Sequence, residues 1–167
     1  MAGASCKDFE NSIFAIYGAT AEAEDSIDAA DSTSVPDNAP SLVIQDVAQF
    51  ASSGAAWTFF KQAQAKYNQC PSISFTSNDA TLGQITETVT NQNISSTTVG
   101  GHNAFQVDQS DEVMIQQDGI SDAESLNTTF VVAGDNVYEI QWLTVSDVHV
   151  PNWMLNTLIG NVQKLYH

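Results

Sequence analysis

The chain has 167 residues, 43% of them hydrophobic, and its 20 acidic residues against four lysines give a formal net charge of −16. This length fits one domain with a proper hydrophobic core. With no arginine and so few lysines, the chain offers no cationic track for phosphates, which excludes nucleic acid binding and attraction to anionic membrane surfaces.

The first predicted element is a helix over residues 6–17, because apolar residues recur there at helical spacing before Gly18. Residues 19–41 are small, acidic and turn-forming, and they lack a periodic apolar face. We therefore predict a mobile acidic surface segment over 19–41, within which a short helix fits near Ala21–Ala30.

A strand is predicted over Ser41–Phe50, where β-branched residues alternate in part with polar ones. The strongest helix of the sequence follows over Ser53–Cys70, capped by a serine at its start and stopped by Pro71. One stripe of this helix collects most of its apolar residues, which are Ala56, Phe60, Ala63, Tyr67 and Cys70.

The chain then becomes rich in predicted strands. Short strands are expected over 72–75, 84–90, 105–108 and 113–115, and the polar stretch between the second and third reads as an exposed strand plus loop. The clearest signal is a hairpin, 126–133 and 137–143, around a Gly-Asp-Asn turn.

Within that hairpin, Tyr138, Ile140 and Trp142 share the face expected to be buried, and Glu139 and Gln141 share the face expected to be wet. Pro151 then opens a predicted last helix. The order of elements indicates one α+β domain over residues 1–167, an antiparallel β-sheet packed against two or three helices. No run of about 18 apolar residues predicts a membrane span.

Two cysteines, Cys6 and Cys70, open the first predicted helix and close the second. They fit an exported protein with one disulfide, which would be worth roughly 4 kcal/mol for a loop of 64 residues. The alternative is a pair of buried free thiols in a cytoplasmic protein.

The sequence contains no motif that specifies a reaction. We find no nucleophile elbow, no H-x-x-x-H and no C-x-x-C, so no catalytic residue, metal site or cofactor is expected. The histidines read as surface loop residues. Asp118, Asp122 and Glu124 lie close together without the alternating spacing of a calcium loop, so the acidic residues are interpreted as solvated surface.

The aromatic residues are the better candidates for a binding site. Most of them are expected to be core residues, and some of them can line an apolar cleft between helix and sheet. The candidates for ligand binding are Trp57, Phe60, Tyr67, Tyr138, Trp142 and Trp153.

The residues AIYGAT after Cys6, the stretch VIQDVAQFASSGAAWTFF and the helix end Tyr67-Asn68-Gln69-Cys70 resemble the PknH-like extracellular domain family. That family comprises sensor domains of mycobacterial membrane kinases and related cell-envelope lipoproteins. The resemblance implies a Cys6–Cys70 disulfide, an extracellular location in the cell envelope and a membrane anchor upstream of residue 1. The chain departs from the family in lacking a second disulfide and in having Tyr67 where tryptophan is usual.

We expect a non-enzymatic sensor-type domain that captures a small apolar or amphiphilic envelope molecule in a cleft. One alternative is a protein-interaction module of an envelope lipoprotein, which would take a protein partner instead. The other is an unconventional hydrolase that uses His102.

Overall fold

The computed structural model describes residues 6, 18–28, 42–116, 119–144 and 157, and the structural statements below concern these residues. They form one long helix, α2 (Ser53–Gln69), and one antiparallel sheet in the order β1-β2-β7-β6-β5-β4-β3. The strands are β1 (Ala21–Asp28), β2 (Leu42–Gln49), β3 (Ser72–Asp79), β4 (Gly83–Val99), β5 (His102–Ile115), β6 (Ile120–Ala133) and β7 (Asn136–Thr144).

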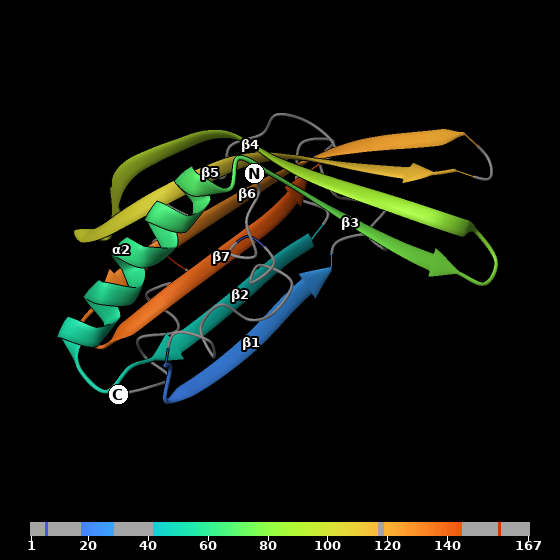
Figure 1. Ribbon diagram of the computed structural model, residues 1–167. Coiled ribbons are helices and arrows are strands. Elements are labelled where there is room, and N and C mark those ends of the chain that lie inside the picture. The colour runs from blue at the N-terminus through green and yellow to red at the C-terminus, as the bar shows by residue number, and fades with distance from the viewer. Residues whose placement is uncertain (1–5, 7–17, 29–41, 117–118, 145–156, 158–167) are drawn as a thin grey trace.

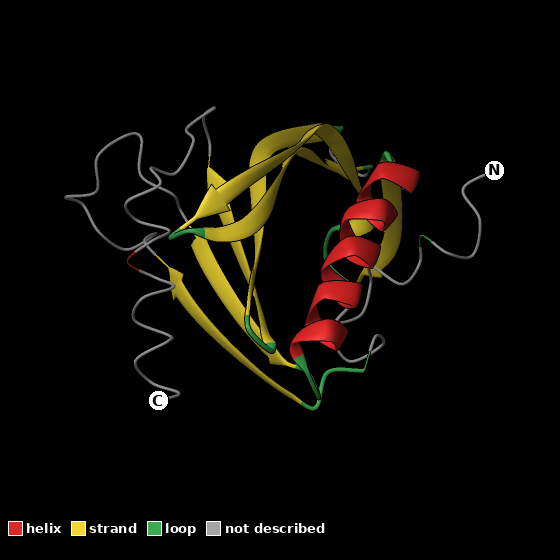
Figure 2. Ribbon diagram, turned by 90° about the vertical axis from the view of Figure 1, so that its left-hand side faces the viewer, coloured by secondary structure: helices red, strands yellow, loops and turns green. Residues whose placement is uncertain are grey.

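The sheet curves into an open half-barrel, and α2 lies along its inner face (Figures 1 and 2). From β3 to β7 the strands follow one another as a meander, and β2 then pairs with β7 and carries β1 at the outer edge. A single sheet with one helix on its inner side therefore organises the described chain.

Helix α2 confirms the prediction over 53–70. Ser52 caps it, with its Oγ accepting a hydrogen bond from the Ala55 N–H at 3.2 Å, and the Cys70 N–H closes the last turn on the Lys66 carbonyl. The residues of its buried stripe face the sheet, and they are Ala56, Phe59, Phe60, Ala63 and Tyr67.

The Ser52 cap gives a first testable expectation. Ser52→Ala removes the only side-chain acceptor that the described structure shows for the first turn of α2, so the free energy of unfolding should fall by about 1 kcal/mol. Urea denaturation measures this. Ser53→Ala is the matched control because Ser53 lies inside the helix and exposed, and an equal loss in both variants would contradict the capping role.

Buried side chains cover both faces of the central strands. On the inner face the rings of Phe105 and Phe130 stack with centroids 4.7 Å apart, and Tyr67 packs on Phe130 at 5.6 Å. On the outer face Tyr138 and Trp142 are buried within a second cluster. Because successive side chains of a strand point to opposite faces, β7 has no solvated side.

The expectation that Glu139 lies on a wet face is therefore wrong. Glu139 is 5% exposed and sits on the inner face, in register with Asp46 of β2 and Phe130 of β6. Its carboxylate accepts a hydrogen bond from Gln141 Nε2 at 2.7 Å. The sequence pattern predicted that one face of this strand is buried, whereas both faces are buried in the structure.

Two sets of bonds hold the C-terminal end of α2. A disulfide joins Cys6 to Cys70, with the Cα atoms 5.8 Å apart, so the pairing implied by the resemblance is present. The Asn91 amide donates to the carbonyls of Tyr67 and Cys70 at 2.8 and 2.9 Å and accepts from Gln109, which itself accepts from Thr128. The helix end is thus tied to β4, β5 and β6.

A β-bulge between Asn91 and Asn93 divides the sheet into two parts. On one side lies the core with α2. On the other side, β3 and the adjoining parts of β4, β5 and β6 (residues 83–91, 109–115 and 120–125) extend past the end of the helix, as Figure 1 shows at the right. We call this extension the arm.

The expected α+β class, with a sheet packed against two or three helices, is wrong. The described chain is mostly β, with seven strands and one long helix, because the polar and acidic stretches read as loop or surface are strands of the sheet. The short helix near Ala21–Ala30 is likewise wrong, since Ala21–Asp28 pairs residue by residue with β2.

The strands expected over 41–50, 126–133 and 137–143 are confirmed. The short strands expected over 72–75, 84–90, 105–108 and 113–115 are parts of the longer strands β3, β4 and β5. The helix predicted over 6–17 and the last helix after Pro151 fall outside the described residues except for Cys6 and Thr157, and all of 29–41 lies outside them. Nowhere in the described chain does a helix combine the length and apolar character that crossing a membrane requires.

Candidate functional site

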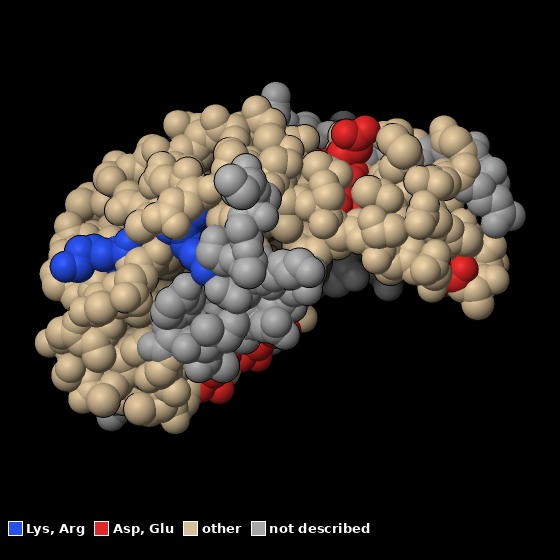
Figure 3. Space-filling model, in the orientation of Figure 1, with Lys and Arg blue, Asp and Glu red and all other residues tan. Residues whose placement is uncertain are grey.

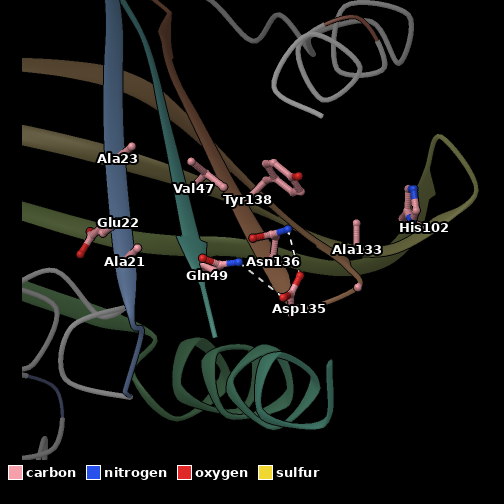
Figure 4. Close-up of a pocket in the computed structure, with 11 residues that line it drawn as sticks. Ala21, Glu22, Ala23, Val47, Gln49, His102, Ala133, Asp135, Asn136 and Tyr138 are labelled. Carbon is pink, nitrogen blue, oxygen red and sulfur yellow. Dashed lines mark hydrogen bonds between the residues drawn. The ribbon is translucent and has the colours of Figure 1, made fainter. Parts of the chain in front are cut away.

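A pocket of about 720 Å³ lies on the outer face of the sheet, at the end where β2 finishes and β7 begins. Strands β1, β2, β5, β6 and β7 all contribute to it. Its described lining, drawn in Figure 4, is Ala21, Glu22, Ala23, Val47, Gln49, His102, Ala133, Gly134, Asp135, Asn136 and Tyr138.

Two cross-strand rows form the floor of this pocket. The first row is small and apolar, because Ala23 pairs with Val47 and Val47 pairs with Tyr138. The second row is more polar. It runs through Ala21, Gln49, Asn136 and Ala133, which are successive partners across β1, β2, β7 and β6.

The polar end of the pocket is built around the β6–β7 turn. Gly134 takes a φ of +64°, which L-residues rarely adopt, and this places Asp135 at the tip. The Asp135 carboxylate accepts from Gln49 Nε2 at 3.5 Å and from Asn136 Nδ2 at 3.2 Å, while its carbonyl accepts from the Phe50 N–H. In Figure 4, Gln49 and Asn136 converge on Asp135.

His102 lies half-buried at the first position of β5, on the side of the pocket beyond Ala133 (Figure 4). It is the residue of the hydrolase hypothesis. Within the described residues, no group of three or more His, Cys, Asp or Glu side chains is arranged to hold a metal ion. Of the acidic trio considered for calcium, Asp118 and the side chain of Asp122 are not described.

The aromatic candidates are divided between the two faces of the sheet. Tyr138 lines the outer pocket, and Trp142 lies four residues further along the same face, 1% exposed. Phe60 and Tyr67 are in the core between α2 and the inner face, with rings 5.1 and 6.2 Å from that of Phe105.

Trp57 is 39% exposed on α2, with its ring 5.1 Å from Phe60. Trp153 lies outside the described residues. Of the five candidates that the structure describes, only Tyr138 lines the pocket. It lies on the face of β7 that the alternation predicted to be buried.

A second unusual site is a row of carboxylates on the inner face, which sequence reasoning missed. Glu24 pairs with Asp46, and Asp46 pairs with the buried Glu139. Burial, and then the charges of Asp46 and Glu22, raise the pKa of Glu139 to about 8 against the lowering effect of the Gln141 hydrogen bond. Burial and the charges of Glu24 and Glu22 raise the pKa of Asp46 to about 6.

Burial raises the pKa of the nearby Tyr67 hydroxyl well above its usual value, and the charge of Glu139 adds to this. Within this row, Asp46 and Glu139 are thus held in surroundings that disfavour their ionised forms. The sequence could not reveal this row, because it depends on the pairing of β2 with β7 and of β1 with β2.

No family model and no curated protein matches the chain. Among solved structures it is similar to the extracellular domain of PknH from Mycobacterium tuberculosis, at a TM-score of 0.53 and 17% identity. That match covers 86% of this chain and 66% of the other. It is also similar to a protein of unknown function from Pseudomonas aeruginosa described as a putative regulator, at a TM-score of 0.40 and 11% identity, covering 75% and 70% of the two chains.

The first similarity shows a shared fold at low sequence identity, and the TM-score of the second is too low to support an argument. The family resemblance read from the sequence is therefore supported as a distant relationship of fold.

Proposed function

We propose that the chain is an extracytoplasmic ligand-binding domain of sensor type, which captures a small apolar or amphiphilic molecule in the outer pocket. The observation that carries this proposal is the pocket itself, about 720 Å³ in volume and assembled from five strands. Small-molecule sites have volumes of this order and combine an apolar lining with a few fixed polar groups.

The two rows of the floor suit an amphiphilic molecule. An apolar portion would lie over Ala23, Val47 and the Tyr138 ring, and a polar portion would meet Gln49 and Asn136, whose amides are already oriented by Asp135. No lysine belongs to the described lining, while Asp135 and Glu22 do. With a formal net charge of −16, the protein therefore favours neutral or cationic ligands over anionic ones.

The extracytoplasmic part of the proposal draws on two observations. The fold is shared with the extracellular domain of PknH. The Cys6–Cys70 disulfide is of the kind that persists in oxidising compartments and is rare in the cytosol. The membrane anchor expected upstream of residue 1 and the absence of enzymatic activity stay predictions.

Filling the pocket tests the ligand-binding proposal. Ala23 is exposed on the floor, so Ala23→Trp should occupy the space above Val47 without disturbing the core, and Ala65→Trp on the exposed side of α2 is the matched control. Each protein is mixed with a lipid extract of bacterial cell envelope and its native mass spectrum is recorded. We expect a discrete added mass on the parent and Ala65→Trp, and at least a tenfold smaller bound fraction on Ala23→Trp.

Equal occupancy of Ala23→Trp and Ala65→Trp would show that a bound molecule lies elsewhere. A bare parent protein, under conditions that preserve known weak complexes, would overturn the small-molecule proposal.

A further inference from the structure

The two edges of the half-barrel differ in how well they are protected against pairing with another strand. Among the described strands β1 and β3 each have one neighbour. Strand β1, AEAEDSID, carries four acidic residues in eight positions, whereas β3, SISFTSND, carries only Asp79 at its end. Charged side chains are a common device that keeps an edge strand from pairing, and β3 lacks that device over most of its length.

The hydrogen-bonding groups of β3 that face outward can be assigned from its register. The Asn91 N–H donates to the Pro71 carbonyl at 2.8 Å, so this pair is a hydrogen-bonded one. Hydrogen-bonded and non-hydrogen-bonded pairs alternate along an antiparallel ladder. The main-chain groups of residues 73, 75 and 77 therefore face β4, and those of residues 72, 74, 76 and 78 face the open edge.

Apolar side chains accompany this open edge on the inner face of the arm. Ile73 and Phe75 alternate with exposed Ser72, Ser74 and Thr76. Behind them, on the neighbouring strands of the same face, lie half-buried Val89, Ile85 and Val113. Helix α2 ends at Gln69, so the arm extends beyond its cover (Figure 1). Strand β1 offers no such surface, since its inner positions are Glu22, Glu24 and Ser26.

The charges of the arm indicate what it would bind. Glu87 lies opposite Phe75, and Asp111 and Glu124 follow on the next strands of the same face. The lysines within the described residues, Lys61 and Lys66, are both on α2, where Figure 3 shows blue atoms at the left while red carboxylates lie on the arm. A second copy of this chain would bring the same acidic residues to the edge. A partner with basic residues would instead be attracted.

From these observations we propose that the open edge of β3 binds an extended segment of a partner protein by strand addition. The segment would form main-chain hydrogen bonds with residues 72, 74, 76 and 78. It would place apolar side chains at alternate positions beside Ile73 and Phe75, and it would carry lysine or arginine toward Glu87 and Asp79. This surface lies on the arm and is separate from the outer pocket.

The test uses a fluorescent peptide that alternates valine with threonine and ends in lysines, with a second peptide that ends in glutamates as the control probe. Fluorescence anisotropy should show saturable binding of the lysine peptide that weakens as salt is raised, and at least about tenfold weaker binding of the glutamate peptide.

Thr76→Pro is the decisive variant, because it removes an outward N–H and blocks the edge without removing a β3–β4 hydrogen bond. We expect its affinity for the lysine peptide to fall at least about tenfold, whereas Thr76→Ala, which keeps the N–H, should stay within about twofold of the parent. Thermal melting checks that both variants fold. Glu87→Gln provides a second readout, with a weaker and less salt-dependent affinity.

Equal binding by Thr76→Pro and Thr76→Ala would overturn the proposal, as would the absence of saturable binding to the lysine peptide. A dimer of the parent in sedimentation experiments that Thr76→Pro abolishes would assign the edge to a second copy of the chain and would also overturn it.

Discussion

Replacing Glu139 by glutamine should raise the melting temperature by about 5–10 °C at pH 8 and change it little at pH 5. Glu139 is buried beside Asp46, and its pKa in the folded protein rises from 4.5 to about 8. Between these two pKa values the unfolded chain ionises this acid freely, whereas the folded protein must keep it protonated. Folding therefore costs free energy over this pH range.

The sign follows from linkage. An acid whose folded pKa is raised contributes stability that is fully present below the unfolded pKa and is lost as the pH rises through the folded pKa. The window therefore runs from about pH 4.5 to about 8, with an upper limit of about 5 kcal/mol for the whole shift. Asp46, with a pKa near 6, adds a smaller loss at the acidic end of the same window.

Melting curves from pH 5 to 8.5 measure this effect in the parent, in Glu139→Gln and in the control Glu112→Gln. Glutamine keeps an oxygen that can accept from Gln141, so the variant loses the charge and little else. Glu112 is exposed on the outer face of β5, away from the carboxylate row, so Glu112→Gln controls for the replacement of a glutamate elsewhere on the sheet. A parent melting temperature that is flat over this range would contradict the account of the carboxylate row.

Removing the disulfide should have the second large effect, a loss of about 4 kcal/mol in the free energy of unfolding. The Cys6–Cys70 bond closes a loop of 64 residues that the unfolded chain would otherwise leave free. Both cysteines are buried, so a double substitution to alanine avoids burying a hydroxyl. Urea denaturation of this variant, and of the parent with and without reductant, gives the measurement.

The Asn91 amide keeps its two hydrogen bonds to the end of α2 when the disulfide is lost, so the variant should still fold. The expected result is a lower urea midpoint together with a steeper slope, because the unfolded chain without the crosslink is less compact and exposes more surface. Identical midpoints for the oxidised and reduced parent would show that the disulfide contributes no net stability.

The sequence predicted α2 and the late hairpin well because each has a local signal. The helix has an N-terminal cap and a periodic apolar stripe. The hairpin has turn residues between two strands in which apolar and polar residues alternate. The sequence predicted only part of β4 as one strand, over 84–90, because the alternation of apolar and polar residues is interrupted after it. Val89 and Ile94 are five residues apart yet share the inner face, since the bulge between Asn91 and Asn93 inserts an extra residue.

Strand β1 was missed for a different reason. Six of its eight residues are alanine or acids, which have low strand propensity, and it is a strand because it pairs with β2. The β1–β2 pairing also forms part of the pocket. Tyr138 could therefore be predicted as a candidate from the alternation in its own strand, but Ala23 and Gln49 could not. Long-range pairing of this kind leaves no trace within a short window of sequence.

The order of the strands also has a consequence for how the chain folds. Strands β3 to β7 pair with their sequence neighbours, so each ladder closes a short loop. The β2–β7 ladder instead joins Gln49 to Asn136 and Leu42 to Leu143, across the helix and the whole meander. Because long loops lose more entropy on closure, the meander can nucleate by local steps while the β1–β2 pair docks late. Strand β7 would then be a transient sheet edge during folding, and its long-range partner would determine the folding rate.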